Sequence, residues 1–351
     1  MNREELVENI KGGEIISKLD LSGMDLSGAK LCGGIFEEVI LREANLAGAD
    51  LRESIFTKPD FSGADLSGVN MHSTVMTDAN LTDVSLKNAV MVEAKLTNSD
   101  LSGTDLTGAD LSTAAFISVT LKDADLSNTN LDRTVLHEAK LQGANLSGAN
   151  LAQTVMMGAA LEGAVFNEAK LHLTIMMNTN LSHMDLKRMQ FTGVQFKGAD
   201  LSGVNFTGAD LTQASFMEAN LSGAVLDQVK AQYAIFMQAK MTNASLKGAF
   251  LKQTSFGEAD LTGTDLSGAE LESSVFERAI CKAARFIGAN LTYCDFSHAD
   301  LSGADMSQAR LFRTKLHRVK EEYTRWDAAG KKVALGTDAE RAEAEDWQPD
   351  L

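Results

Sequence analysis

The sequence of 351 residues predicts an all-β solenoid whose chain turns a corner every five residues and closes a four-sided coil every twenty. Three observations predict this fold. From Ile16 to Leu316, nearly every position whose number ends in 1 or 6 carries Leu, Phe, Met or Ile, with Ala231 and Cys281 as the departures. Positions that end in 4 or 9 carry mostly Ala, Thr, Ser or Val. No insertion or deletion shifts this register.

A period of five matches neither the 3.6-residue turn of a helix nor the alternation of a long strand. It fits a chain in which each five-residue side points one large and one small side chain inward. Stacked coils then pair backbone to backbone at about 4.8 Å, and residues 16–316 provide about fifteen coils. Each buried Leu or Phe contributes roughly 1.5–3 kcal/mol, so the stacked column is a sufficient core without globular packing.

Triplets of Ala, then Asp or Asn, then Leu recur throughout this repeat region. The pattern closely resembles the Ala-(Asp/Asn)-Leu-X-X motif of the pentapeptide-repeat family, and the resemblance implies a right-handed quadrilateral β-helix. Members of that family differ in function: some mimic DNA and bind type II topoisomerases, and others act in bacterial secretion systems. The resemblance therefore predicts the fold and leaves the function open. Matching triplets include Ala109-Asp110-Leu111, Ala144-Asn145-Leu146, Ala219-Asn220-Leu221, Ala259-Asp260-Leu261 and Ala289-Asn290-Leu291.

Residues 1–15 are predicted to form an N-terminal helical cap. Residues 2–10 have the pattern of a short helix that ends at Gly12-Gly13. A solenoid needs such a cap because an open coil presents unpaired strand edges. The apolar residues that would cover the first coil are Leu6, Val7 and Ile10.

Residues 317–351 are predicted to form a C-terminal cap followed by a flexible acidic tail. The spacing of Val319, Tyr323 and Trp326 is approximately helical, which indicates a helix that closes the last coil. A linear docking motif with Trp347 as its anchor is the functional alternative to a merely flexible end.

The composition excludes several classes of protein. Lys and Arg number 32 against 48 Asp and Glu, a formal net charge of −16, which argues against direct nucleic-acid binding because phosphate backbones require basic patches. The sequence contains no run of 18 or more apolar residues, so it predicts no membrane span. Its N-terminus lacks the apolar stretch of a signal peptide. We therefore expect a cytoplasmic protein, with export by a signal-peptide-independent route as the alternative.

No set of residues predicts catalysis. The six histidines are expected to fall on different coils and sides, so we expect no metal site. The sequence has no nucleophile elbow, phosphate loop or paired buried carboxylates, and a filled coil offers no concave site. Cys281 and Cys294 fall at inward positions, where a thiol acts as a small apolar group, and Cys32 faces outward. We therefore expect neither enzyme activity nor a bound cofactor.

Outward positions twenty residues apart share one side of the coil, and one side differs in kind. It carries Ile15, Ile35, Ile55 and Val75 at its start, so we call it the Ile/Val side. Exposed apolar patches usually mark partner sites, and Met, which flanks this side in its middle section, suits adaptable binding surfaces. We therefore predict a protein-binding surface formed by Val135, Val155, Met157, Ile175, Met177, Met217, Tyr233, Ile235 and Met237.

The coil at residues 229–233 is expected to be irregular, because Ala231 stands where the repeat requires a large inward residue. A Leu-sized vacancy costs several kcal/mol in a rigid core when nothing refills it. We predict that this coil departs from square geometry and that Tyr233, at its corner, belongs to the contact surface.

These patterns favour a non-enzymatic scaffold that binds another protein or forms a homodimer, with a bacterial secretion-system accessory or effector as one form. Ladders of Ile and Val that merely raise β propensity are the structural alternative. The competing function is a DNA-mimicking binder, inhibitor or protector of a type II topoisomerase such as gyrase. Acidic stripes on two adjoining sides favour it, although Asp is also the consensus residue of the motif. These stripes include Asp20, Asp25, Asp60, Asp65, Asp100 and Asp105.

Overall fold

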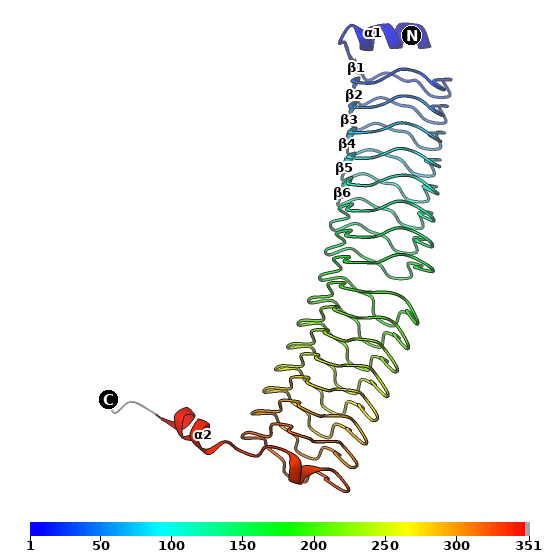
Figure 1. The fold of residues 1–351 in the computed structure, drawn as a ribbon. Helices are drawn as coiled ribbons and strands as arrows, with labels where there is room; N and C mark the ends of the chain where they lie inside the picture. The colour runs from blue at the N-terminus through cyan, green and yellow to red at the C-terminus, as the bar shows by residue number, and fades with distance from the viewer. Residues whose placement is uncertain (348–351) are drawn as a thin grey trace. The chain divides into compact units, whose positions relative to one another are not determined.

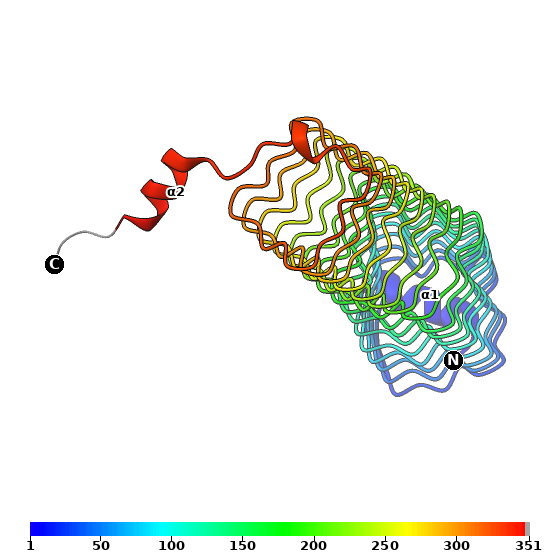
Figure 2. The same ribbon diagram turned by 90° about the horizontal axis from the view of Figure 1, so that it is seen from below.

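The computed structural model describes residues 1–347 and forms two compact units, Met1–Asn180 and Leu181–Leu351. Each unit is a stack of four-sided parallel coils, so the predicted right-handed quadrilateral β-helix is confirmed (Figure 1). In the view of Figure 2, the coils overlie one another as loops of similar outline within each unit. Backbone partners lie twenty residues apart on all four sides, as in the pairs Ile15 with Ile35, Asp20 with Ile40, Asp25 with Asn45, and Lys30 with Asp50.

Helix α1, Arg3–Lys11, precedes the first coil (Figure 1). Its N-terminus is closed by a capping box: the Asn2 side chain accepts the N–H of Glu5, and the Glu5 carboxylate accepts the N–H of Asn2, both at 2.9 Å. Leu6 and Ile10 are buried, whereas Val7 is half-buried. The segment expected to be helical is therefore a helix, and two of its three apolar residues are buried.

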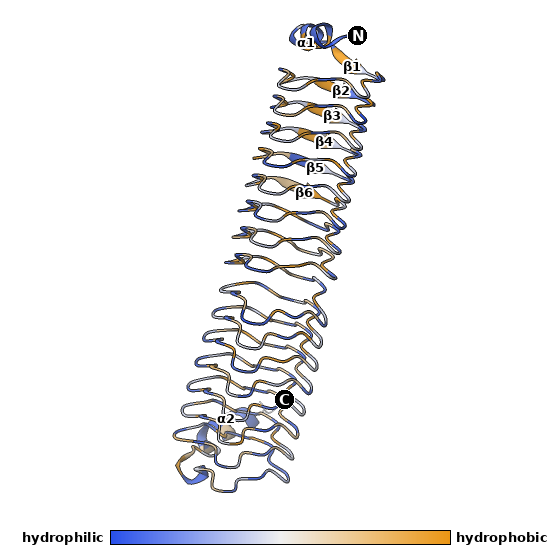
Figure 3. Ribbon diagram, turned by 90° about the vertical axis from the view of Figure 1, so that its right-hand side faces the viewer, coloured by the Kyte–Doolittle hydropathy of each residue, from blue (hydrophilic) through white to orange (hydrophobic). Residues whose placement is uncertain are grey.

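Six strands form a parallel sheet in chain order on the Ile/Val side of the first unit. They are β1 Ile15–Ser17, β2 Ile35–Glu37, β3 Ile55–Thr57, β4 Val75–Thr77, β5 Lys95–Thr97 and β6 Ala115–Ile117. The central residue of each strand is buried and its neighbours face outward. Figure 3 shows hydrophobic, orange segments along β1 to β3. Beyond β6 this side continues as single bridges, Val135 with Val155 and Val155 with Ile175.

The corners of the coil depend on residues with positive φ at positions that end in 3 or 8. Gly23 and Gly28, with φ of 67° and 60°, occupy two of these corners, and glycine adopts this conformation without a Cβ penalty. Just before the corner, Asp20 accepts the N–H of Ser22 at 3.0 Å, which is an Asx turn. The Asp-Leu-Ser-Gly sequence therefore specifies a side and its corner together.

The core of each unit is a column of fully buried large side chains. Small inward positions that carry Thr are satisfied by backbone carbonyls: the Thr134 hydroxyl donates to the carbonyl oxygen of Leu111 at 2.7 Å. In the second unit the Ile/Val side holds a continuous stack of parallel phenylalanine rings, with centroids 4.5–5.1 Å apart. These are Phe196, Phe216, Phe236, Phe256, Phe276 and Phe296.

The coil at Ala231 keeps the bridges of the regular repeat, Asp210 with Lys230 and Lys230 with Phe250. Ala231 is fully buried, and its N–H donates to the carbonyl oxygen of Phe250 at 2.8 Å. The predicted departure from regular geometry is therefore not found in the hydrogen-bond ladder. One small inward side chain therefore does not disturb the backbone pairing of this coil.

The helix expected within residues 317–329 is absent, because this segment of the described chain forms one more coil. Lys320 bridges Asp300 and Arg325 bridges Asp305 in the regular register. The inward positions of this coil carry Glu321 and Trp326, so the sequence loses its apolar period while the backbone keeps the repeat. The chain then continues into a short 3-10 helix, Lys331–Val333, and helix α2, Ala339–Asp346.

The last coil ends in a polar lid. The Lys331 ammonium lies 4.5 Å above the centre of the Trp326 ring and 2.6 Å from a carboxylate oxygen of Glu321. A cation over an indole face and an ion pair thus cover the end of the column in place of the expected apolar helix. Of the expected tail, residues 348–351 lie outside the described part of the chain, and Trp347 is exposed.

Candidate binding surface

In the first unit, the predicted surface residues are present on the Ile/Val side but are only partly accessible. Val135, Val155 and Ile175 stack through their bridges, and all three are half-buried. Met157 and Met177 beside them are also half-buried. The most exposed apolar side chains of this side lie at its start instead, with Ile15, Ile35 and Ile55 at 56, 37 and 44 % exposure.

Charge interrupts the Ile/Val side of the first unit in its middle. Lys95 is exposed at the centre of the column, between Val75 and the small Ala115. A hollow of about 330 Å³ lies there, lined by these three residues and by polar side chains on the adjacent corner. The apolar surface of this unit is therefore two separate stretches and not one continuous strip.

In the second unit, three of the predicted residues lie close together and are exposed. Tyr233, Ile235 and Met237 are 55, 36 and 38 % exposed, whereas Met217 is half-buried. Val275, two coils further along the same side, is 38 % exposed. We call Tyr233, Ile235, Met237 and Val275 the apolar patch of the second unit.

A shallow hollow of about 160 Å³ lies within this patch, between Met237 and Val275. Ser255 and Gly257 form its floor, and a Cβ at Gly257 would meet no heavy atom closer than 3.8 Å. Small residues between two larger apolar ones therefore create the depression. Its rim is polar and carries Glu258, Glu277 and Arg278. An apolar centre with a charged rim is the usual anatomy of a protein interface.

The carboxylates of the acidic stripes are engaged in the coil's own hydrogen bonds. Asp20 accepts both the N–H and the hydroxyl of Ser22, and these bonds hold the pKa of Asp20 below its usual value. Other members pair with cations on the preceding coil: Arg42 lies 2.6 Å from Asp60, and Lys87 lies 2.9 Å from Asp105. Neighbouring cations therefore balance the negative charge of Asp60 and Asp105.

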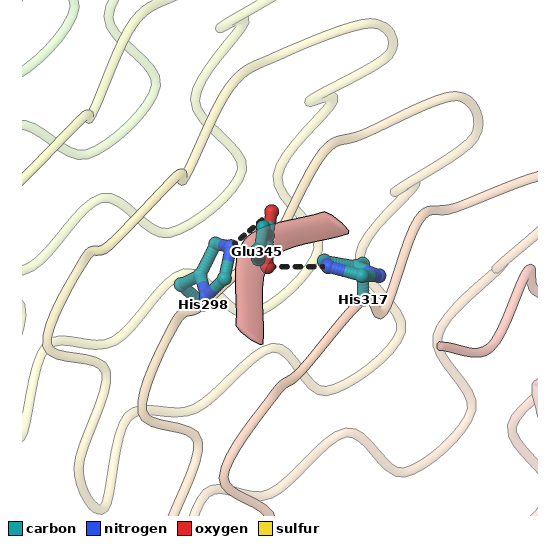
Figure 4. A group of neighbouring side chains, drawn as sticks. All are labelled: His298, His317 and Glu345. Carbon is teal, nitrogen blue, oxygen red and sulfur yellow. Dashed lines mark hydrogen bonds and ion pairs between the residues drawn. The ribbon is translucent and has the colours of Figure 1, made fainter. Parts of the chain in front are cut away.

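Two of the histidines expected on different coils and sides, His298 and His317, lie on different coils but meet at one corner, so the expectation of different sides was wrong for this pair. The rings of His298 and His317 lie 5.2 Å apart, and the carboxylate of Glu345 on α2 lies between them (Figure 4). The Nε2 atoms of His298 and His317 lie 3.3 and 3.1 Å from the two oxygens of Glu345. A spacing of nineteen residues places two side chains on adjacent coils at one corner, which is the signal the sequence carried.

Arginine adds to the charge around Glu345, since Arg341 Nε and Arg318 Nε lie 2.9 and 3.3 Å from its oxygens. Hydrogen bonds from His317, and then from Arg341 and His298, lower the pKa of Glu345 to about 2. The ligand atoms of His298, His317 and Glu345 lie within 4.8 Å of one another, so a metal ion has to be considered.

The hydrogen bonds of His317 do not fit a metal ligand. Its Nδ1 accepts the backbone N–H of Asp338 at 3.1 Å, so its Nε2 carries the proton that points at Glu345. A metal-ligating imidazole needs the reverse, a bare nitrogen toward the ion and an N–H donated from the other nitrogen. The cluster is therefore arranged as a hydrogen-bonded clamp on a carboxylate.

Of the three cysteines, two are buried and one is exposed. Cys294 is buried, its thiol donates to the carbonyl oxygen of Leu271 at 3.0 Å, and burial raises its pKa to about 12. Burial also raises the pKa of Cys281, whereas Cys32 is exposed. Among residues 1–347, the helices α1 and α2 are too short and too polar to span a bilayer.

Comparison with known proteins places the chain in a family. No curated protein matches the sequence. Two of the solved structures that match are similar to this chain at low sequence identity. QnrB1, a plasmid-mediated fluoroquinolone resistance protein, is in one trypsin-treated form 21% identical over 53% of this chain and 91% of its own, with a TM-score of 0.34. HetL, a pentapeptide-repeat protein involved in heterocyst differentiation regulation in the cyanobacterium Nostoc sp. strain PCC 7120, is 21% identical over 96% of this chain and 98% of its own, with a TM-score of 0.22.

The family model described as pentapeptide repeats matches overlapping segments that together span residues 20–72 and 74–318. These segments cover well over half of the sequence and coincide with the coils described above. The chain belongs to the pentapeptide-repeat family.

Proposed function

We propose that the protein is a non-enzymatic scaffold that binds another protein through the apolar patch of the second unit. The observation that carries this proposal is the joint exposure of Tyr233, Ile235 and Met237 beside a hollow with a charged rim. Exposed apolar side chains gathered in one place usually mark a partner site. Aromatic residues are common energetic anchors of interfaces, and Met adapts to differently shaped partners.

The structural alternative is that these side chains only support the stack. It applies well to Val135, Val155 and Ile175, which are half-buried against their neighbours along the column. It applies less well to Tyr233, because this side chain stands at a corner and is more than half exposed. The proposal is therefore restricted to the second unit and leaves the predicted residues of the first unit in a supporting role.

A matched pair of variants tests the proposal. Ile235→Asp charges the patch, and Val225→Asp makes the same chemical change on the opposite side of the coil, at a position where the repeat often carries Asp. We expect Ile235→Asp to abolish binding to a partner or to a second copy, and Val225→Asp to leave it unchanged. Molar mass by light scattering reports on binding to a second copy. Binding to another protein is measured with the partner that is identified by cross-linking to the apolar patch. Equal behaviour of the two variants would mean that the side is only structural.

The second candidate is a DNA-mimicking binder of a type II topoisomerase, which the net charge of −16 and the rows of Asp favour. The pairing of Asp60 and Asp105 with cations counts against it, because a mimic must present free negative charge to its partner. A gyrase supercoiling assay distinguishes the scaffold from the DNA mimic. If micromolar protein has no effect on supercoiling, the DNA-mimic hypothesis is rejected. A secretion-system role is one form of the scaffold, and gene neighbourhood tests it.

A further inference from the structure

Helix α2 is held against the last two coils by polar groups alone. No side chain of α2, all of which lies within residues 1–347, is buried. Arg318 donates to the carbonyl oxygen of Ala342 at 2.7 Å and pairs with Asp346 near the end of the helix. Glu345 contacts His298, His317 and Arg318, and Arg341 donates to the Ser297 hydroxyl at 3.5 Å. A contact without buried apolar area is exchangeable, because exposed ion pairs contribute little net stability.

The segment that leads to α2 is hydrogen-bonded to the coil by its backbone. The helix can therefore dissociate from the coil without unwinding it. Leu335 forms the last bridge, with Lys315, and its N–H donates to the carbonyl oxygen of Thr314 at 2.8 Å. The Thr337 hydroxyl accepts the N–H of Arg318 at 3.2 Å. Backbone pairing therefore ends just before α2 begins at Ala339, and beyond that point the side-chain contacts of Arg318, Arg341 and Glu345 hold the helix.

The side chains that hold Glu345 form a defined binding site on the coil. The side chain of His317 is only 4 % exposed, and its Nε2 points at the position of the carboxylate. His298 supplies a second imidazole and Arg318 a guanidinium, which suits paired carboxylate oxygens. We call His298, His317 and Arg318 the carboxylate receptor.

The charge around the receptor is opposite to that of the whole chain. Residues 310–332 carry eight Lys and Arg against three Asp and Glu, in a protein of net charge −16. Several of these cations pair with the coil before them, as Lys315 does with Asp295 and Arg325 with Asp305. Others form no ion pair with any residue among 1–347, namely Arg310, Arg313, Lys320 and Lys332. Residues 310–332 therefore retain unpaired positive charge, which attracts an acidic segment.

We propose that the carboxylate receptor is a second docking site, separate from the apolar patch, and that it takes an acidic helical segment of a partner protein. In the absence of that partner, α2 occupies the receptor and keeps it closed. The chemistry required of the partner is read from α2: two adjacent carboxylates at the end of a short helix, in the positions of Glu345 and Asp346.

The test uses the full chain and a labelled peptide with the sequence of residues 337–347. Glu345→Gln combined with Asp346→Asn removes the two carboxylates that α2 places in the receptor and keeps their size. We expect this double variant to bind the peptide at least tenfold tighter than the wild type by fluorescence anisotropy. Adding Arg318→Glu should remove that binding. The matched control, Glu340→Gln with Glu343→Gln, takes the same charge from α2 at residues with no ion pair among residues 1–347, and should behave as the wild type.

Four outcomes overturn the proposal. Equal peptide binding by wild type and double variant means that α2 does not occupy the receptor. Equal binding of a peptide with Gln and Asn at the two acidic positions means that carboxylates are not recognised. Tighter binding of a short oligonucleotide than of the peptide makes this a phosphate site. Stoichiometric Zn²⁺ binding by the wild type that Glu345→Gln removes makes the cluster a metal centre.

Discussion

The ring of Phe236 lies parallel to the ring of Phe216 one coil earlier, with centroids 4.7 Å apart and an angle of 2° between the planes. The same relationship continues from Phe236 to Phe256, at 5.1 Å. Each ring is fully buried, so it contacts the coil before and the coil after. The repeat thus converts one side chain per twenty residues into a continuous aromatic column.

Phe236→Ala should destabilise the second unit by about 3–5 kcal/mol, because it removes a buried ring together with its stacking contacts to Phe216 and Phe256. Phe236→Leu restores the residue most common at inward positions and should cost less than half as much. Hydrogen exchange measured peptide by peptide is the readout, since a solenoid loses its coils locally. Equal protection of residues 216–256 in the alanine variant and the wild type would contradict the stacked column.

Stability should fall in acid because several carboxylates have lowered pKa values in the folded protein. Burial raises the pKa of Asp295, but hydrogen bonds from Ser297 and Lys315 outweigh it, so the net shift is downward. A carboxylate with a depressed folded pKa stabilises the protein above its unfolded pKa, near 4, and this contribution is lost as the pH falls through the folded value.

Melting temperature against pH measures this effect. We expect a plateau above about pH 5 and a steady decrease below pH 4, since the unfolded carboxylates titrate near 4. Asp295→Asn should lower the plateau and make the acid decrease shallower than in the wild type. If the curve of melting temperature against pH for Asp295→Asn is parallel to that of the wild type and only lies lower, Asp295 takes no part in the pH dependence.

The polar lid should protect the last coil from fraying. Trp326→Ala removes the ring beneath Lys331 and leaves the ion pair of Lys331 with Glu321 without its support. We expect faster amide exchange in residues 301–325 and no change near α1. Lys331→Met keeps the apolar contact with the ring and should have a smaller effect. Unchanged exchange in the alanine variant would show that the last coil needs no lid.

The fold could be predicted from the sequence because the period of five is set by what fits inside a coil. Large side chains at inward positions and small ones beside them are required on every side, and even Ala231 and Cys281 do not break the backbone ladder. The final coil escaped prediction because Glu321 and Trp326 stand at its inward positions, where no further coil covers them. The apolar period therefore ends before the backbone repeat does.

The candidate site was predicted only in part, because the exposure of an outward residue depends on its neighbours on adjacent coils. Val155 is half-buried between Val135 and Ile175, whereas Met237 is exposed because Gly257 beside it is small. The two histidines of the carboxylate receptor have a nineteen-residue spacing, which the sequence displays, but the carboxylate that they hold, Glu345, lies on α2. No periodic pattern in the sequence predicts where α2 docks.

Site-specific photo-cross-linking in the source cells tests the scaffold most directly. A benzophenone amino acid placed at Met237 reports on the apolar patch, and the same group at Ser267, on a different side of the coil, is the control. We predict one reproducible protein product from position 237 that is absent from position 267. Excess wild-type protein should compete for this product, and Ile235→Asp should not. Identical products from both positions, or none from position 237, would contradict the assignment of the patch as a binding surface.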